Sequence, residues 1–196
     1  MVRAAREAGI AQLTLYSFSR ENWNRPAEEV QGLMRLHEEM IQTEVPTLHE
    51  NGCRVVFIGS RDNLDKRLLA KMEWAEALTA GNRDLILFIA FNYGGRQEIV
   101  DAVRKAASAG VDPATITEED ISQHLYSPLM RDPDLCIRTS GEKRLSNFLL
   151  WQSAYSELYF SERLWPDFDE EEFKRALADY AKRERRFGRR HEAGDA

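Results

Sequence analysis

Short apolar runs alternate along this chain with longer stretches whose apolar residues recur every three or four positions. The runs at residues 13–18, 54–58, 85–90 and 135–138 are apolar almost throughout, which is typical of strands covered on both faces. The periodic stretches predict helices over residues 2–8, 27–50, 64–78, 97–107, 118–125, 148–155 and 170–186. This alternation predicts an α/β fold with a mostly parallel sheet and helices on both faces.

The longest predicted helix, over residues 27–50, has clear boundary residues, with Pro26 before its first turn and Gly52 just after its end. Pro46 lies inside the pattern and predicts a kink or an interruption. The apolar stripe of this helix is interpreted as a face packed on the core, or alternatively as partly the lining of an apolar tunnel. It consists of Val30, Leu33, Met34, His37, Met40, Ile41, Val45 and Leu48.

A glycine-containing loop with two arginines joins the strand at 135–138 to the helix predicted from residue 148. Arg138 and Arg144 flank this loop, and Ser146 or Asn147 stands where the cap of that helix is expected. Unpaired N–H groups at a helix N-terminus attract anions, and guanidinium groups bind phosphate through paired hydrogen bonds. The loop therefore predicts a phosphate or diphosphate site, with an ordinary turn carrying solvated arginines as the alternative.

Two further polar clusters follow predicted strands. Residues 19–26 contain a serine, two asparagines, a tryptophan and two arginines, and residues 92–96 contain an asparagine, a tyrosine and two glycines. In parallel α/β sheets, loops at the carboxyl ends of strands build the ligand site. We therefore expect both clusters to belong to a site. The alternatives are helix capping by Asn24 and a plain tight turn at Gly94 and Gly95.

Composition mainly excludes other classes of protein. The chain has 196 residues, 43% of them apolar, and a formal charge of −6, which predicts one domain over 1–196 and argues against nucleic acid as the main partner. The basic end, from about residue 182 to 196, is interpreted as a solvated or dimer-contacting helix end rather than a nucleic-acid binder. The sequence contains no GxxxxGK[ST] loop, GxGxxG fingerprint or DDxxD cluster, and no apolar run approaches twenty residues. We expect a soluble, cytoplasmic protein.

Four stretches resemble signatures of the cis-prenyltransferases, the undecaprenyl diphosphate synthase family. They are residues 15–26, 91–96, 138–152 and 157–168, in the family's order, and the resemblance extends from about residue 8 to residue 188. It implies a cis-prenyltransferase-like fold and a transferase that condenses isopentenyl diphosphate onto an allylic diphosphate, such as farnesyl diphosphate, forming Z double bonds. It also implies Mg²⁺, a homodimer and a role in supplying the lipid carrier for cell-wall glycans. We further expect a peripheral membrane contact for product release.

The resemblance assigns roles to individual residues of this sequence. Arg138, Arg144 and Ser146 would bind the diphosphate of isopentenyl diphosphate, and Leu145 would be a further substrate-binding residue. Glu157 would help to bind Mg²⁺, with a solvated or capping carboxylate as the alternative. Asn22 would act in catalysis by positioning a proton acceptor, such as a diphosphate oxygen, because an amide is a poor base. The rest of the substrate pocket would be lined by Ser19, Arg20, Glu21, Trp23 and Arg25.

The sequence departs from the family pattern at its start. The family opens with a strand and a D-G-N-x-R-W loop that supplies a Mg²⁺-binding aspartate, whereas this sequence begins with residues that match a later helix. We expect an N-terminally truncated chain that lacks this first strand–helix unit, through an incomplete gene model or as a degenerate fragment. The competing interpretation is a non-catalytic partner subunit of a heteromeric prenyltransferase, which would not need the loop.

Overall fold

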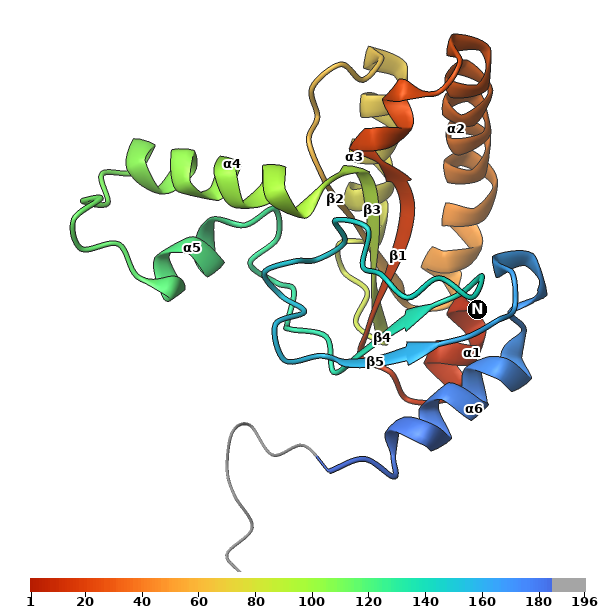
Figure 1. Cartoon of the computed structure of the whole chain (residues 1–196). Coiled ribbons are helices and arrows are strands. Elements are labelled where there is room, and N and C mark those ends of the chain that lie inside the picture. Colours follow the sequence, from red (N-terminus) through yellow and green to blue (C-terminus); the bar gives the residue numbers. More distant parts are fainter. Residues whose placement is uncertain (185–196) are drawn as a thin grey trace, which may run out of the picture. The chain divides into compact units, whose positions relative to one another are not determined.

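A computed structural model describes residues 1–184, which form two compact units (Figure 1). The large unit contains residues 2–131 and 146–151, and the small unit contains Met1 with residues 132–145 and 152–184. The single domain expected over 1–196 stays a prediction. Residues 185–196, which include most of the expected basic end, lie outside the described part of the chain.

A three-stranded parallel sheet forms the centre of the large unit, in the order β1-β3-β2. Its strands are β1 (Gln12–Ser19), β2 (Cys53–Ile58) and β3 (Leu85–Tyr93), and they confirm the first three predicted strands. Leu87 of β3 pairs with Leu13 on one side and with Val55 on the other. Because β3 is the central strand, most of its side chains are buried, which explains its apolar sequence. The predicted α/β class with a parallel sheet is confirmed.

Helices α2 (Ala27–Glu50) and α3 (Lys66–Thr79) lie side by side over one face of this sheet (Figure 1). Asp65 caps α3 by accepting a hydrogen bond from the backbone N–H of Arg67 at 2.7 Å. The core beneath these helices contains Phe18, Val30, Ile41, Val45, Val55, Phe57, Leu68, Met72, Ala75 and Phe91. The interruption expected at Pro46 does not occur. Ile41 and Val45, which precede Pro46 in α2, pack into this one core and hold the helix together.

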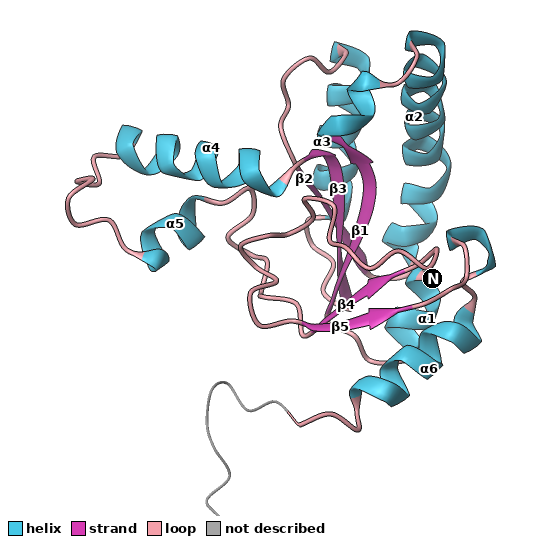
Figure 2. Cartoon of the chain, viewed as in Figure 1, coloured by secondary structure: helices cyan, strands magenta, loops and turns pink. Residues whose placement is uncertain are grey.

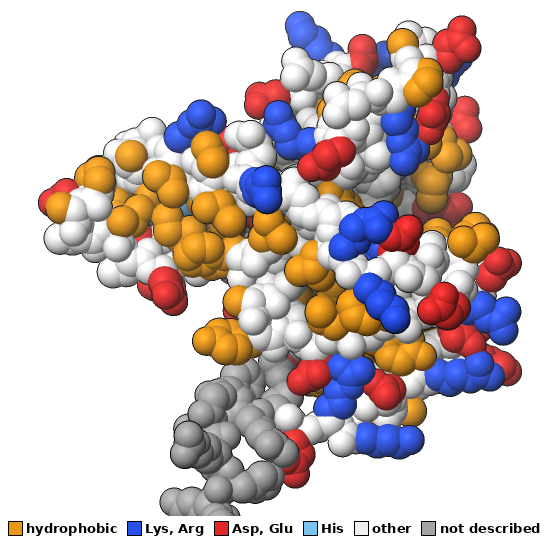
Figure 3. Space-filling view, viewed as in Figure 1, with side chains coloured by type: hydrophobic (Ala, Val, Ile, Leu, Met, Phe, Trp, Pro, Cys, Tyr) orange, Lys and Arg blue, Asp and Glu red, His pale blue; other side chains and the backbone are white. Residues whose placement is uncertain are grey.

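The opposite face of the sheet packs against residues from later in the chain. Phe88 and Ala90 of β3 lie with Leu149 in one buried cluster, and Tyr126 and Phe148 pack against it. Beyond the sheet, α4 (Gly95–Ser108) and α5 (Glu118–His124) hold a smaller core of Ala102, Ile121 and Leu125. Figure 3 shows the hydrophobic side chains gathered between these two helices. The remaining elements of the large unit are α1 (Val2–Glu7) and the 3₁₀ helix η1 (Arg20–Asn24).

The small unit contains two parallel strands and a helix. They are β4 (Leu135–Arg138), β5 (Glu157–Phe160) and α6 (Glu170–Tyr180), with a 3₁₀ turn η2 (Trp165–Asp167) between the last two. The fourth predicted strand, at 135–138, is confirmed, and β5 was not predicted. The helix predicted over 170–186 ends at Tyr180, and its last two predicted residues lie outside the described part.

The helix predicted over residues 148–155 is wrong. These residues form turns, and Figure 2 shows no helix there. Ser146, Asn147 and Leu149 have φ values of 50°, 63° and 42°, which are incompatible with a right-handed helix. Apolar spacing alone therefore misled the prediction, because tertiary contacts of this segment override its local preference.

Within residues 1–184, no helix is both long enough and apolar enough to cross a membrane.

Candidate active site

The carboxyl ends of β1 and β3 bring two of the predicted polar clusters together in the large unit. Ser19, at the end of β1, pairs with Tyr93, at the end of β3. The indole N–H of Trp23 donates a hydrogen bond to Asn92 Oδ1 at 2.8 Å. Asn92 itself is buried and donates to the backbone oxygens of Ser60, at 2.9 Å, and Asp62, at 3.0 Å. The clusters at 19–26 and 92–96 therefore form one connected structure, as expected from parallel-sheet geometry.

The side chain of Asn22 organises the turn after β1. Its Oδ1 atom accepts a hydrogen bond from the backbone N–H of Ser19 at 2.9 Å, which closes η1. Asn24 does not cap α2, because the N-cap of that helix is Pro26, without a side-chain hydrogen bond. Arg25 forms an ion pair with Glu29 at 2.8 Å, one turn into α2. Trp23 packs edge-on against Phe18 and still exposes 37% of its surface, so it is only partly a core residue.

Residues 146–151 bring a third polar group to this end of the sheet. Asn147 Nδ2 donates to Glu21 Oε1 at 2.8 Å, and Asn147 Oδ1 accepts from the backbone N–H of Arg96 at 2.9 Å. Partial burial raises the pKa of Glu21, but hydrogen bonds, first among them the one from Asn147, and the charge of Arg20 outweigh burial and lower this pKa overall. Glu21 is therefore a carboxylate at neutral pH.

Gly94 and Gly95 allow this close approach of the 146–151 segment. A Cβ atom on Gly94 would lie 2.8 Å from Asn147 Nδ2, and one on Gly95 would lie 2.9 Å from Leu150 Cγ and 3.1 Å from the backbone oxygen of Asn147. Neither glycine has a positive φ. The glycine pair therefore serves for close packing rather than for a tight turn, which corrects that alternative.

A cleft of about 400 Å³ lies beside Trp23, between α2 and the start of α3. Its apolar lining comes from Trp23, Val30, Met34 and Leu68. Its polar lining comes from Gln31, Arg35, Glu38, Asn63, Asp65 and Arg67. The core-facing interpretation of the α2 stripe is confirmed at Ile41 and Val45, whereas Met34 lines a cleft whose lining residues are mostly polar, so the apolar tunnel stays a prediction.

His37, a member of the predicted α2 stripe, is a polar residue in a largely apolar setting. Its Nε2 lies 2.6 Å from Ser17 Oγ, and its Nδ1 lies 2.6 Å from the backbone oxygen of Leu33. Its ring packs on Phe91, with ring centroids 4.6 Å apart. Burial lowers the pKa of His37, so this imidazole is neutral at neutral pH.

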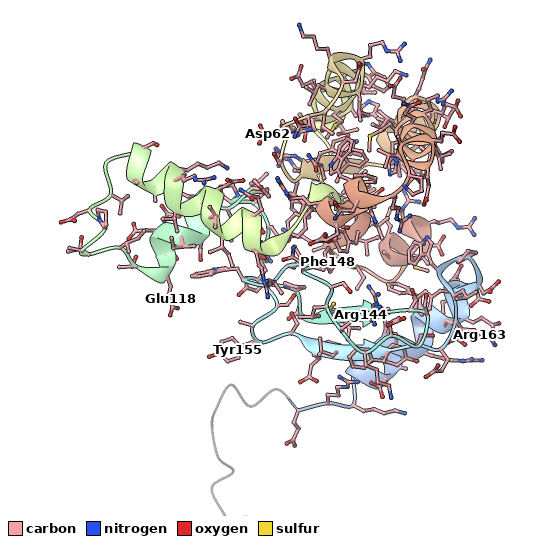
Figure 4. All side chains as sticks on the ribbon, turned by 45° about the horizontal axis from the view of Figure 1, so that its top comes forward. Asp62, Glu118, Arg144, Phe148, Tyr155 and Arg163 are labelled. Carbon is pink, nitrogen blue, oxygen red and sulfur yellow. The ribbon has the colours of Figure 1, made fainter. Side chains whose placement is uncertain are left out.

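The arginine loop belongs to the small unit. Arg138 ends β4, and its Nε atom is buried without a hydrogen-bond partner among residues 1–184. Arg144, labelled in Figure 4, is exposed and forms an ion pair with Glu142. The loop is fixed by backbone hydrogen bonds from Ser140 N–H to Arg163 O at 2.6 Å and from Gly141 N–H to Ser161 O at 2.9 Å. The arginines of the predicted anion site are present, but its helix N-terminus is not.

Glu157 is the first residue of β5, where it forms an ion pair with Arg183 at 2.9 Å. It is therefore neither a capping group nor a freely solvated carboxylate. In the described part of the chain, no three His, Cys, Asp or Glu side chains gather in a group that could hold a metal ion. These residues do not form a Mg²⁺ site by themselves.

The structure thus places Ser19, Arg20, Glu21, Asn22, Trp23, Arg25 and Ser146 in the large unit. It places Arg138, Arg144, Leu145 and Glu157 in the small unit. Their individual roles stay predictions. Sequence reasoning missed the contacts of Asn147. The sequence did contain a clue to these contacts, because asparagine tolerates positive φ and Asn147 stands between a serine and an apolar run. The sequence analysis interpreted this clue as a helix cap.

Comparisons with known proteins agree with one another. A family model described as "Putative undecaprenyl diphosphate synthase" matches residues 1–188. The isoprenyl transferase of Thermotoga maritima is 52% identical over 190 residues, which cover 95% of this chain and 81% of that protein. The ditrans,polycis-undecaprenyl-diphosphate synthase ((2E,6E)-farnesyl-diphosphate specific) of Escherichia coli K12 is 50% identical over 191 residues, covering 95% and 76%.

Two solved structures are similar as well. One is lavandulyl diphosphate synthase from Lavandula x intermedia in complex with dimethylallyl diphosphate, with a TM-score of 0.91 and 38% identity, covering 95% of this chain and 83% of that one. The other is a probable undecaprenyl diphosphate synthase from Campylobacter jejuni, with a TM-score of 0.89 and 34% identity, covering 96% and 88%.

Proposed function

We propose a residue-level function for this chain, which belongs to the undecaprenyl diphosphate synthase family of cis-prenyltransferases. Its reaction joins isopentenyl diphosphate to an allylic diphosphate, repeatedly, to give a polyprenyl diphosphate with Z double bonds. The observation that carries this function is about 50% identity, over 95% of the chain, with a farnesyl-diphosphate-specific undecaprenyl diphosphate synthase. A non-catalytic partner subunit is not favoured, because the similar proteins are named as transferases and synthases.

The diphosphate of isopentenyl diphosphate is the ligand we assign to Arg138, Arg144 and Ser146, with Leu145 as a further substrate-binding residue. Arg138 supports this assignment, because its Nε is buried without a hydrogen-bond partner in residues 1–184 and an anion would accept a hydrogen bond from it. Arg144 is exposed, and its ion pair with Glu142 holds it only weakly against a diphosphate.

The chemical step forms one carbon–carbon bond as one carbon–oxygen bond breaks. The isopentenyl double bond attacks the allylic carbon, the allylic diphosphate leaves, and a proton is lost from the isopentenyl portion. Asn22 orients the acceptor of that proton, for which a diphosphate oxygen is suited. Ser19, Arg20, Glu21, Trp23 and Arg25 line the reacting end of the substrates. Catalysis by these residues is positioning and charge stabilisation.

The cleft beside Trp23 is our candidate for the isoprenoid chain. Trp23 and the half-buried Met34 offer the apolar contacts that a hydrocarbon requires. A cleft lined by both apolar and charged side chains suits a ligand with a hydrocarbon tail and a charged head.

Mg²⁺ is the cofactor we propose, and it would neutralise charge on the diphosphates. Mg²⁺ commonly takes one or two carboxylates and completes its shell with phosphate oxygens and water. Glu157 is the candidate carboxylate, although its ion pair with Arg183 would have to open. The described residues do not form a metal site by themselves, so the diphosphate oxygens and water would supply the other ligands.

A homodimer in the cytoplasm, with a peripheral membrane contact for product release, completes the proposal. The small unit supports an interface, because it exposes Tyr155 by 71%, Leu164 by 57% and Trp165 by 52%. The polyprenyl diphosphate would serve as the lipid carrier for cell-wall glycans.

The direct test is incorporation of labelled isopentenyl diphosphate into extractable polyprenyl product, with farnesyl diphosphate and Mg²⁺. We expect incorporation that a chelator abolishes. Arg138→Ala should raise the KM for isopentenyl diphosphate by about tenfold or more, because a hydrogen bond to a charged group is lost. Arg104→Ala is the matched control, since Arg104 is an exposed arginine on α4 that pairs with Asp101. Absence of labelled product with the unaltered chain would overturn the proposal.

A further inference from the structure

Asn147 connects its own segment, residues 146–151, to two other segments of the large unit. Its Nδ2 donates to Glu21 Oε1 at 2.8 Å, after β1. Its Oδ1 accepts from the backbone N–H of Arg96 at 2.9 Å, and its backbone oxygen accepts from Gly95 N–H at 2.7 Å, at the start of α4. The side chain therefore uses both ends of its amide, one toward a carboxylate and one toward the backbone.

The backbone around Asn147 is held in a conformation that L-residues rarely adopt. Asn147 has φ 63°, Ser146 before it has φ 50°, and Leu149 after it has φ 42°. Such residues persist only where their surroundings over-determine them, and they gather at ligand clamps. Here the surroundings are the hydrogen bonds of Asn147, buried Leu149, and the close contact with the two glycines before α4.

The contact between Asn147 and Glu21 does not serve the hydrophobic core. Glu21 is exposed, and a hydrogen bond at an exposed site contributes little to the free energy of unfolding. What it does fix is direction. It holds one carboxylate oxygen of Glu21 toward the 146–151 segment, next to the exposed Ser146.

We propose that Asn147 is a positioning residue for the diphosphate substrate, acting through its hydrogen bond to Glu21. This inference rests on the proposed function. It extends that function to Asn147, a residue to which the proposed function assigns no contact with substrate. The amide of Asn147 sets the orientation of the Glu21 carboxylate, and Asn147 directly follows Ser146 in the chain; Glu21 and Ser146 both belong to the proposed substrate-binding residues. Losing that orientation weakens binding of isopentenyl diphosphate more than it slows turnover.

Asn147→Asp is the sharpest probe of this contact. Aspartate tolerates positive φ, and it keeps an oxygen for the Arg96 N–H. It replaces the Nδ2 donor by an oxygen, however, and this oxygen meets the Glu21 carboxylate at the distance where a hydrogen bond stood. The two like charges repel, so the Glu21 carboxylate turns away.

Glu21→Gln provides the matched partner. Glutamine keeps an oxygen that accepts from Asn147, so the contact survives in the single variant. In the double variant, the glutamine amide at position 21 donates to the aspartate carboxylate at position 147, and the hydrogen bond forms again in the reverse direction. Asn147→Asp should therefore be harmful only when residue 21 is glutamate.

The experiment measures kcat and the KM for isopentenyl diphosphate in four proteins: the unaltered chain, the two single variants and the double variant. With Glu21 present, Asn147→Asp should raise this KM by about tenfold or more and change kcat less. In the Glu21→Gln background, the same substitution should change KM by less than about threefold.

Equal effects of Asn147→Asp in both backgrounds would overturn the inference while the proposed function stood, since turnover by the unaltered chain is measured in the same assay. No turnover by the unaltered chain would instead overturn the proposed function, and the inference with it. A purely structural role for Asn147 would lower the melting temperature and kcat without the selective change in KM, and this outcome also counts against the inference.

Discussion

Two glycines of the large unit, Gly95 and Gly32, differ in the space around them. At Gly95 a Cβ atom would lie 2.9 Å from Leu150 Cγ and 3.0 Å from the Leu150 backbone nitrogen, whereas at Gly32, on α2, nothing lies within 4 Å. The closest contact at Gly95 is shorter than real Cβ atoms tolerate, so Gly95→Ala forces the 146–151 segment away.

We predict that Gly95→Ala lowers the free energy of unfolding by about 1–3 kcal/mol through overpacking. Gly32→Ala should raise it by about 0.5–1 kcal/mol, because alanine is the better helix former. Urea unfolding of both variants checks the pair. Stabilisation by both substitutions would show that residues 146–151 do not press on Gly95.

His37 gives the folded chain a pH dependence at the residue scale. Its pKa is lowered in the folded state by burial, so the unfolded state binds a proton at higher pH than the folded state does. As pH falls below the unfolded value of about 6.5, protonation favours unfolding, and stability decreases until the lower, folded pKa is reached.

We therefore predict that the free energy of unfolding falls between about pH 7.5 and about pH 5.5 and that His37→Gln removes part of this fall. Denaturant titrations at the two pH values measure the difference. His124→Gln is the control, because that ring lies at the end of α5 and contacts the backbone oxygen of Asp120. An unchanged pH dependence in His37→Gln would contradict the assignment.

At the scale of whole elements, α2 contains a destabilising residue that its packing overcomes. Pro46 lies inside α2, is exposed, and cannot donate a backbone hydrogen bond to the preceding turn. Replacement by alanine restores that donor and removes no buried surface. We expect Pro46→Ala to raise the free energy of unfolding by about 1–3 kcal/mol.

Chemical denaturation measures this effect, with Pro128→Ala as the comparison in an exposed loop position. The loop substitution should be neutral or slightly destabilising, since proline there restricts the unfolded chain. A destabilised Pro46→Ala protein would mean that the α2 backbone is already adapted to the proline ring.

The elements also show how far sequence reasoning reaches. The bounds predicted for α2 agree with the structure, because Pro26 and Gly52 act locally at its two ends. Strands β1 to β3 were predictable from their continuous apolar runs. Strand β5 was missed because it has only four residues, and its side chains alternate between half-buried and exposed. The helix at 148–155 was wrong because the backbone N–H groups of Gly95 and Arg96, distant in sequence, bind Asn147 and hold this segment in turns.

In the candidate site too, local features could be predicted from the sequence and contacts between distant residues could not. The residues after β1 could be predicted, since the end of a parallel strand is a general location for ligands. The partnership of Asn147 with Glu21 could not, because it joins positions 126 residues apart through an exposed contact that leaves no periodic pattern.

At the scale of the whole molecule, the proposed homodimer can be tested on the small unit. Leu158 exposes 37% and Phe160 38% of their surfaces on the same face of β5. We predict that Leu158→Glu weakens dimerisation by about tenfold or more, because a charge would be placed in an apolar contact. Sedimentation over a range of protein concentrations measures the dissociation constant.

Leu36→Glu on α2 is the control for this substitution, since Leu36 exposes 48% of its surface in the large unit and the substitution introduces the same charge. If both variants dissociate alike, net charge rather than β5 sets the association. If neither dissociates, β5 is not part of the interface.

The placement of Trp23 gives the protein an optical reporter of its own. The indole is anchored by its N–H to buried Asn92, and the ring forms part of the cleft wall. All four tryptophans lie in the described residues, and Trp23 is the one that lines this cleft. An apolar ligand entering the cleft displaces water from that ring and moves its fluorescence to shorter wavelength, while the other three indoles keep their emission. Filling of the cleft can thus be followed in real time in the unlabelled protein, and Trp23→Phe identifies the signal.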